Sequence, residues 1–319
     1  MEIVEKAVMD SKQLIAPRPP EPINKNNSEY FLQRAKTFGL QKHGAQPKLS
    51  SYIKDAFRRK EFIRALGENN SYSKNQGKYL GQMWALLSPT LNAIFYVIFF
   101  GLILRAGGEL SNGIAFIIIG QFLWQFLKFS ASTGGKSVSS KTNIVRSLHF
   151  PKVVLPLATV YSLFVKFLWS SIVMLAMVML SGLLPSYSMI FPHYRWLLLP
   201  LVFILMFFFA SGVAFIIARI VAKIPDLSNV VDFLLRFGMF ASGVVFPITR
   251  FVSSGQMLYL ILTYQPFAVY INLARQIIMN EALIPMTLSS WVAAIIWTVV
   301  TFTVGFIFFW RGESNYGRS

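Results

Sequence analysis

Residues 84–104 read WALLSPTLNAIFYVIFFGLIL and lie within a 26-residue stretch, residues 79–104, that contains no Asp, Glu, Lys or Arg. About 20 predominantly apolar residues are enough for a helix to cross the hydrocarbon core of a bilayer. Comparable runs recur along the chain, and we expect six spans, at residues 82–104, 113–130, 153–180, 196–218, 229–248 and 290–310. The pattern predicts an all-α membrane protein with six transmembrane helices.

The composition divides the chain into a polar arm and one membrane domain. Of 319 residues, 55% are hydrophobic and 13% charged, whereas a soluble domain carries about 25% charged residues. Residues 1–81 hold 15 of the 30 Lys and Arg. We expect a disordered cytoplasmic arm at 1–48, an amphipathic interface helix and linker at 49–81, a transmembrane domain at 82–310 and a cytoplasmic tail at 311–319.

The distribution of basic residues predicts the orientation in the membrane. With the N-terminus inside, the inner segments hold 24 Lys and Arg and the outer segments hold four. Positive charge accumulates in cytoplasmic loops. We therefore expect a multi-pass membrane protein with both termini in the cytoplasm. The absence of cysteine and the sequence style favour the bacterial cytoplasmic membrane. The same bias accounts for the net charge of +17 without a nucleic-acid partner.

Residues 50–66 have the pattern of an amphipathic helix. Apolar side chains, among them Tyr52, Phe57 and Ile63, can share one face, and basic side chains fall largely elsewhere. Such a helix just before a span lies on the inner membrane surface. Two interpretations stay open, an electrostatic anchor to membrane lipid alone or an anchor that also contacts a partner protein.

Two loops are unusual. The outer segment 249–289 is rich in apolar residues and predicts two short re-entrant helices that separate near Gln265 and Pro266, with two further spans as the alternative. The inner loop 131–152 predicts a short amphipathic helix followed by Phe150 and Pro151, an apolar knob with a basic rim. That shape suits a groove on a soluble partner, and an interfacial helix without a partner is the alternative.

Several residues within the spans invite a functional interpretation. Lys166 near the middle of the third span either lines a substrate cavity, pairs with a buried partner or extends to the interface. Asp232 and Arg236 are four residues apart and predict an ion pair along one helix face. Aromatic side chains such as Trp124, Trp169 and Phe240 either fill the core and lipid-facing surface or line a path for sugar rings.

No catalytic or metal-binding set is evident in the sequence. There is no cysteine, and the three histidines lie far apart. Residues 130–137 (SASTGGKS) differ from a phosphate-binding loop at the first glycine, and a membrane span rather than a strand precedes them. Acidic residues within the predicted spans are too few for a proton relay. The energy source is therefore expected on another chain.

The order of short motifs resembles a known family. Residues 79–84 (YLGQMW) with Pro89, residues 120–124 (GQFLW), residues 143–152 (NIVRSLHFPK) and residues 218–227 (ARIVAKIPDL) follow one another as in the membrane subunits of ABC-2-type exporters. The tail 311–317 (RGESNYG) is similar to that of the branch exporting polysaccharides and teichoic acids. One departure is Gln265-Pro266, where the family often has Asn-Pro.

The resemblance implies a permease subunit with no enzymatic activity and no cofactor of its own. It implies a homodimer with two copies of a separate ATPase, which holds ATP and Mg, and a lipid-linked glycan as substrate. ATPase coupling would fall to Lys141, Asn143, Ile144, Arg146, Leu148, His149, Phe150 and Pro151. The interface helix would use Tyr52, Phe57, Arg58, Arg59 and Ile63. The charge and aromatic pattern adds a candidate substrate path at Lys166, Trp124, Trp169, Arg236 and Phe240.

The substrate class stays open within this resemblance. A teichoic acid, a galactan or an O-antigen polymer would each fit an exporter of this branch. A drug exporter of the same fold and a membrane enzyme of glycolipid synthesis are the alternatives.

Overall fold

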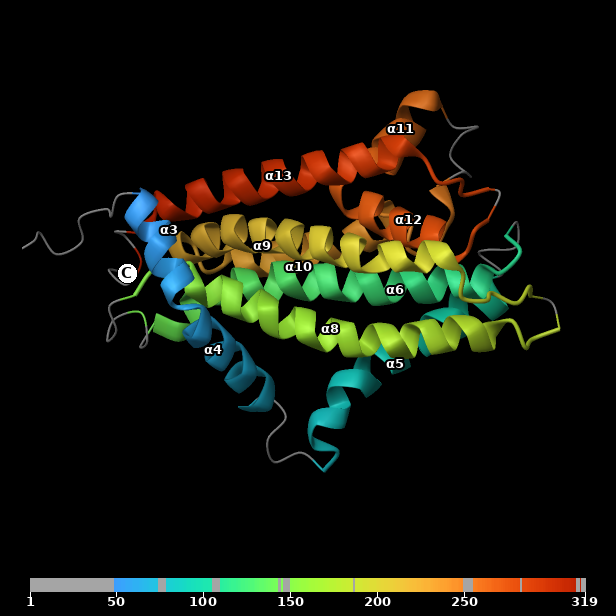
Figure 1. The fold of residues 1–319 in the computed structure, drawn as a ribbon, viewed down its shortest axis with the longest axis horizontal. Coiled ribbons are helices and arrows are strands. Elements are labelled where there is room, and N and C mark those ends of the chain that lie inside the picture. The colour runs from blue at the N-terminus through green and yellow to red at the C-terminus, as the bar shows by residue number, and fades with distance from the viewer. Residues whose placement is uncertain are drawn as a thin grey trace, which may run out of the picture. The chain divides into compact units, whose positions relative to one another are not determined.

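The computed structural model describes residues 49–73, 79–104, 110–142, 145, 150–185, 187–248, 255–281, 283–313 and 316. Every regular element in these ranges is helical, which confirms the predicted all-α class (Figure 1). The predicted arm at 1–48 lies outside the described residues. The main helices are α3 (Leu49–Arg58), α4 (Lys60–Ser73), α5 (Trp84–Tyr96), α6 (Gly113–Phe129), α8 (Val154–Ser181), α9 (Leu199–Lys223), α10 (Leu227–Ala241), α11 (Gln256–Tyr264), α12 (Pro266–Ile278) and α13 (Leu288–Trp310).

Shorter helical elements extend or connect these helices. The π-helix η2 (Val97–Ile103) continues α5, and the π-helix η3 (Ser130–Gly134) continues α6. The 3-10 turns are η1 (Gly81–Met83), η4 (Ser139–Lys141) and η5 (Tyr194–Leu198).

Five helical segments in the described part of the chain are long and apolar enough to cross a membrane. They are Trp84–Ile103, Gly113–Gly134, Val154–Ser181, Tyr194–Lys223 and Leu288–Trp310. Each overlaps one of the six predicted spans, because the length of an apolar run is the main requirement that a bilayer imposes on a helix.

The remaining predicted span, residues 229–248, differs from the structure in its second half. Helix α10 has 15 residues and ends at Ala241, so it is about 22 Å long. Gly243 follows with φ +65°, a left-handed conformation that terminates helices and that glycine adopts readily. The expectation of one continuous helix to residue 248 is therefore wrong.

The outer segment contains the two short helices that the sequence predicts. Helices α11 and α12 meet at Gln265 and Pro266 with a bend of 81°. Pro266 has no backbone N–H to donate, and it forces Gln265 into an extended conformation with ψ 147°. A broken span and a re-entrant pair both agree with this bend.

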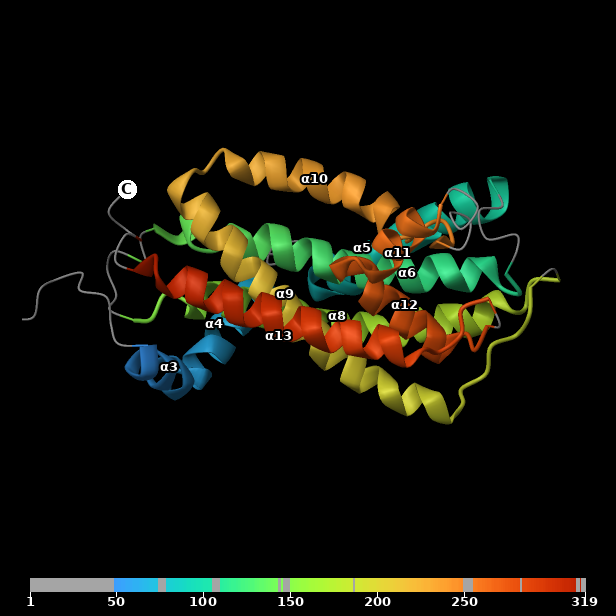
Figure 2. The ribbon, with the colours of Figure 1, turned by 90° about the horizontal axis from the view of Figure 1, so that it is seen from above.

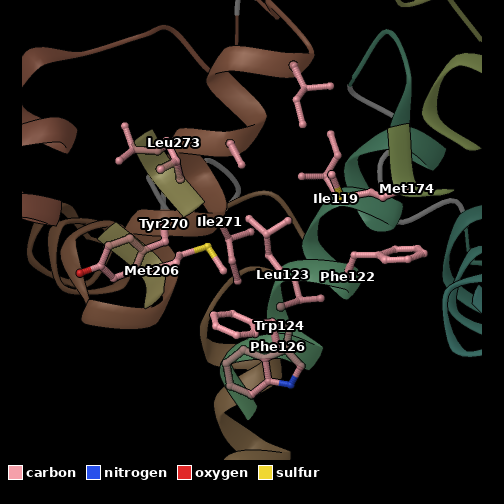
Figure 3. Packing of buried hydrophobic residues seen from close by; sticks show 14 of the residues in the cluster. Ile119, Phe122, Leu123, Trp124, Phe126, Met174, Met206, Tyr270, Ile271 and Leu273 are labelled. Atoms are coloured by element: carbon pink, nitrogen blue, oxygen red, sulfur yellow. The ribbon is translucent and has the colours of Figure 1, made fainter. Parts of the chain in front are cut away.

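Helix α6 is the central element of the bundle. Residues 113–127 are all buried, and α6 packs against α5, α8 and α12. Figure 3 shows Phe122, Leu123 and Trp124 of α6 among core side chains that include Met206 of α9 and Tyr270 of α12. By contrast, α5, α10 and α13 expose many large apolar side chains, as expected for surfaces that face lipid or another subunit. Helix α10 lies at the edge of this helix group (Figure 2).

Helices α9 and α13 form the most extensive helix pair and cross at two glycines. A Cβ atom on Gly212 would lie 2.5 Å from the carbonyl oxygen of Thr301, and one on Gly305 would overlap the backbone of Gly212. Small residues let membrane helices approach closely where no hydrophobic force drives them together.

We expect Gly212→Leu to destabilise the protein by about 1–3 kcal/mol or more, because the side chain has no space between the two backbones. Thermal unfolding in detergent, followed by loss of monodisperse protein, measures the effect. Ile204→Leu on the exposed side of α9 is the control and should leave the unfolding temperature unchanged. Equal unfolding temperatures for both variants would contradict this packing.

Candidate functional site

Helix α3, the start of α8 and the residues that follow α13 meet in a polar cluster, which we call the terminal junction: Tyr52, Lys152, Val153, Glu313 and Tyr316. Figure 1 shows α3, the start of α8 and the end of α13 at one end of the bundle. The hydroxyl of Tyr52 donates to Glu313 Oε2 at 2.7 Å and accepts from the amide of Val153 at 3.1 Å. One side chain therefore connects three segments that lie far apart in the sequence.

Lys152 completes the terminal junction. Its amide donates to Glu313 Oε1 at 3.0 Å, and its Nζ donates to the carbonyl oxygens of Glu313 at 3.1 Å and Tyr316 at 2.8 Å. Tyr316 in turn donates to the carbonyl oxygen of Phe309 at 2.9 Å. These bonds hold the C-terminal tail against the residue at which the predicted coupling segment ends.

Burial determines the electrostatics of the terminal junction. Glu313 is 8% exposed, and this burial raises the pKa of its carboxyl group even though the hydrogen bonds from Tyr52 and Lys152 act in the opposite direction. The pKa of Tyr52 is raised well above its ordinary value, mainly by burial and secondly by the neighbouring Glu313 carboxylate. Tyr52 therefore stays protonated and remains a donor at physiological pH.

Tyr52→Phe is expected to destabilise the docking of α3 by about 1–3 kcal/mol, since the Val153 amide and the Glu313 carboxyl group both lose a buried partner. Limited proteolysis of the purified protein would detect earlier release of the terminal segments. Tyr79→Phe, at a fully exposed position, is the matched control. Identical digestion of the two variants would refute this function of Tyr52.

The described part of the predicted coupling segment leads directly into the terminal junction. Lys141 ends η4 and is half-buried, and burial lowers its pKa. Phe150 is buried and packs edge-on against Phe62 of α4, with ring centroids 5.6 Å apart. It is therefore not an exposed knob, because α4 covers it. The carbonyl oxygen of Pro151 accepts a hydrogen bond from the amide of Val154 at 3.1 Å. Asn143, Ile144, Arg146, Leu148 and His149 lie outside the described residues.

The predicted interface-helix residues divide between two sides. Tyr52 is buried, and Ile63 is half-buried in the same apolar cluster as Phe150. Phe57 is 76% exposed, and Arg58 and Arg59 are exposed beside it. The break at Arg59 separates α3 from α4, so the segment is two helices rather than one. An aromatic and basic surface thus faces outward next to the terminal junction.

Asp232 has a different partner from the one that its spacing predicts. Lys136 donates to Asp232 Oδ2 at 2.6 Å, and Ser132 donates to Oδ1 at 2.5 Å, whereas Arg236 is exposed. The predicted Asp232–Arg236 pair is wrong, since Ser132 of η3 and Lys136 in the turn after it bring a hydroxyl and a competing cation to the carboxylate. The residues that resemble a phosphate-binding loop instead continue α6 and connect it to α10.

The structure brings together only two of the five residues that the sequence proposes for a substrate path. Lys166 and Trp169 line the same cavity on α8. Trp124 is in the core, with its ring 5.6 Å from that of Phe267. Arg236 and Phe240 are exposed on α10.

Sequence reasoning missed Arg275, the most unusual charge in the membrane domain. Its side chain is fully buried on α12 and donates to the carbonyl oxygens of Phe116, Gly243 and Val244 at 2.7–3.2 Å. The guanidinium also lies over the Phe116 ring, 3.3 Å from its centroid. Arg275 thus fastens α12 to α6 and to the turn after α10. The sequence feature that could have indicated a buried arginine is the single charge in the otherwise largely apolar run of residues 266–279.

This arrangement defines a multi-pass membrane protein. Arg275 holds a re-entrant or broken helix pair, α11 and α12, to the bundle on one side, and the terminal junction lies on the other. The chain belongs to the ABC-2 type transporter family, whose pattern matches residues 65–279. This confirms the family to which the motifs pointed.

Named relatives come from two bacteria. The chain is 25% identical over 197 residues to the O-antigen export system permease protein RfbA of Myxococcus xanthus, covering 62% of this chain and 72% of the relative. It is 26% identical over 204 residues to an O-antigen export system permease protein RfbA of Klebsiella pneumoniae, covering 64% and 74% respectively.

Proposed function

We propose that this chain is the permease subunit of an ATP-driven exporter that moves a lipid-linked envelope polysaccharide outward across the bacterial cytoplasmic membrane. The observation that carries the proposal is the family match over residues 65–279 together with relatives named as O-antigen export permeases. The five long apolar helices agree with a conduit. The proposed substrate is a polymer of the teichoic acid, galactan or O-antigen type.

The energy for transport comes from a separate ATPase, present in two copies, which binds ATP and Mg. Residues 141–151 and the exposed side of α3 are its docking surface. The terminal junction supports this function because Tyr52 and Lys152 tie α3, the coupling segment and the C-terminal tail together. A push on the coupling segment would therefore move α3 and the end of α13 as one unit.

Two copies of the subunit form the path between them. The support is the exposed apolar surface of α5 and α10, which includes Phe95, Phe99, Phe233 and Phe237. Such surfaces need lipid or a second subunit to cover them. Both termini are in the cytoplasm in this arrangement, as the bias of basic residues indicates.

Affinity purification of the full chain in mild detergent tests the proposal. We expect an ATPase to copurify, and depletion of this chain in cells should accumulate lipid-linked glycan on the inner leaflet. Accumulation of a small amphiphile with normal surface polysaccharide would indicate a drug exporter instead. Glycolipid synthesis by the purified chain alone would indicate an enzyme and contradict the permease assignment.

A further inference from the structure

The residues that resemble a phosphate-binding loop hold an anion in the structure. Ser132 of η3 and Lys136 in the turn after it lie one helical turn apart, and the amide of Lys136 donates to the carbonyl oxygen of Ser132 at 3.1 Å. Their side chains donate to the two oxygens of the Asp232 carboxylate at 2.5 and 2.6 Å. A hydroxyl and an ammonium group thus bind this carboxylate as they would bind a phosphate. A π-helical turn such as η3 is frequent at functional sites.

Two glycines set the position of this turn. A Cβ on Gly134 would lie 2.8 Å from the Cβ of Ala214, and one on Gly135 would overlap a side chain of α9. The turn therefore lies directly on α9, while the side chains of Ser132 and Lys136 reach the neighbouring helix α10. The small residues of this motif serve packing, and its hydroxyl and ammonium groups are presented together on the side of α10.

Two cations act on the single carboxylate. Besides Lys136, the positive charge of Lys128, near the end of α6, also acts on Asp232. The side chains of Lys136 and Asp232 remain 36% and 32% exposed, so a ligand can reach them. Because phosphate and diphosphate groups carry more charge and more acceptor oxygens than one carboxylate, they suit a site with two lysines.

The site lies at the level of lipid headgroups and borders an apolar surface. The apolar segment Gly113–Gly134 ends two residues before Lys136, and Asp232 is about 8 Å along α10 from the first residue of that helix. Phe233 and Phe237 of α10 are 56% and 60% exposed. Anion-binding groups beside an exposed apolar helix surface fit a ligand with a phosphorylated head and a long apolar tail.

We propose that Ser132, Lys136 and Lys128 bind the phosphate groups of the lipid carrier of the transported glycan, and that Asp232 occupies this site until the carrier replaces it. This inference rests on the export function proposed above. Replacement would release α10 from η3, because the two hydrogen bonds of Asp232 join these elements. Binding of the carrier would thereby be coupled to movement of α10, the helix at the edge of the bundle (Figure 2).

Binding of a fluorescent polyprenyl diphosphate to the complete transporter in phosphatidylcholine nanodiscs tests this site. We expect Lys136→Met to bind the probe at least about tenfold more weakly, since one charge-assisted contact is lost. Asp232→Asn should bind it several-fold more tightly, because the carboxylate no longer competes for the site. Lys223→Met, at an exposed lysine at the end of α9, is the matched control and should bind as the wild type does.

The opposite effects of the two substitutions separate a ligand site from a structural ion pair. Weaker binding by both variants would show a structural pair and overturn the proposal. Displacement of the probe by an excess of phosphatidylglycerol would assign the site to bilayer phospholipid and would also overturn it. If Lys136→Met does not fold, Asp232→Asn decides, since tighter binding supports the site and unchanged or weaker binding contradicts it.

Export by the same preparations distinguishes failure of this site from failure of the proposed function. ATP-dependent export by the wild type, with unchanged probe binding in Lys136→Met, would reject the site and leave the export function intact. Probe binding with the predicted pattern in a protein that exports no glycan would contradict the export function and leave the phosphate site in place.

Discussion

The double charge reversal Lys141→Glu with Arg146→Glu is expected to abolish the coupling of ATP hydrolysis to transport. Lys141 lies at the end of η4, and Arg146 follows in the segment that the family resemblance assigns to the ATPase cleft. Placing like charges at a complementary interface costs several kcal/mol, which corresponds to docking weaker by about 100-fold. ATPase stimulation and polymer export, measured with the purified partner in proteoliposomes, should both fall to background.

The reversal must leave the fold intact for this result to be informative. None of the hydrogen bonds of the terminal junction involves Lys141, so we expect the unfolding temperature to change little. Arg195→Glu is the control and should couple normally, because Arg195 lies in η5 before the N-terminal end of α9, whereas Tyr52 and Tyr316 of the terminal junction pack near the C-terminal half of α9. Unchanged coupling in the double variant would remove this segment from the ATPase interface.

Arg275→Met is expected to have the largest effect on stability. Three buried carbonyl oxygens, those of Phe116, Gly243 and Val244, would each lose a charged donor. At about 1 kcal/mol or more for each orphaned group, the loss is about 3 kcal/mol. Helix α12 would then be released from α6, and little folded protein should be recovered from membranes.

The Arg275→Lys variant keeps the positive charge but loses the planar guanidinium, so it separates the effect of the charge from that of the hydrogen-bonding geometry. A single ammonium cannot reach carbonyl oxygens of two different elements as the planar guanidinium does, so this variant should be intermediate in unfolding temperature. Arg236→Met, at an exposed arginine on α10, is the control. Wild-type stability of Arg275→Met in detergent would show that the carbonyl contacts do not hold α12.

Much of the fold follows from local sequence. Five of the six spans that the apolar runs predict correspond to helices that could span a membrane, because the bilayer imposes a similar minimum length on every such helix. The break at Pro266 was also predictable, since proline removes a helical donor. The end of α10 was not, because residues 242–248 are as apolar as a span, and a single left-handed glycine, Gly243, ends the helix.

The site was less predictable because its contacts are distant in sequence. Tyr52 and Glu313 are 261 positions apart, and no periodicity relates them. Asp232 has a suitable partner four residues away, yet the distant Lys136 is closer in space. The charge count places Arg275 only in an outer segment, because counting charges cannot tell whether a side chain there faces solvent or the protein core. The family motifs indicated the coupling segment, and the junction that anchors it emerges only from the packing.

Transport in proteoliposomes containing this chain, with and without its ATPase, tests the central claim most directly. Inside-out vesicles would be loaded with lipid-linked glycan on the cytoplasmic-facing leaflet, and its appearance on the opposite leaflet would be followed after addition of ATP. We predict ATP-dependent movement only when both proteins are present. Movement of the glycan by this chain alone, without the ATPase, would contradict the account.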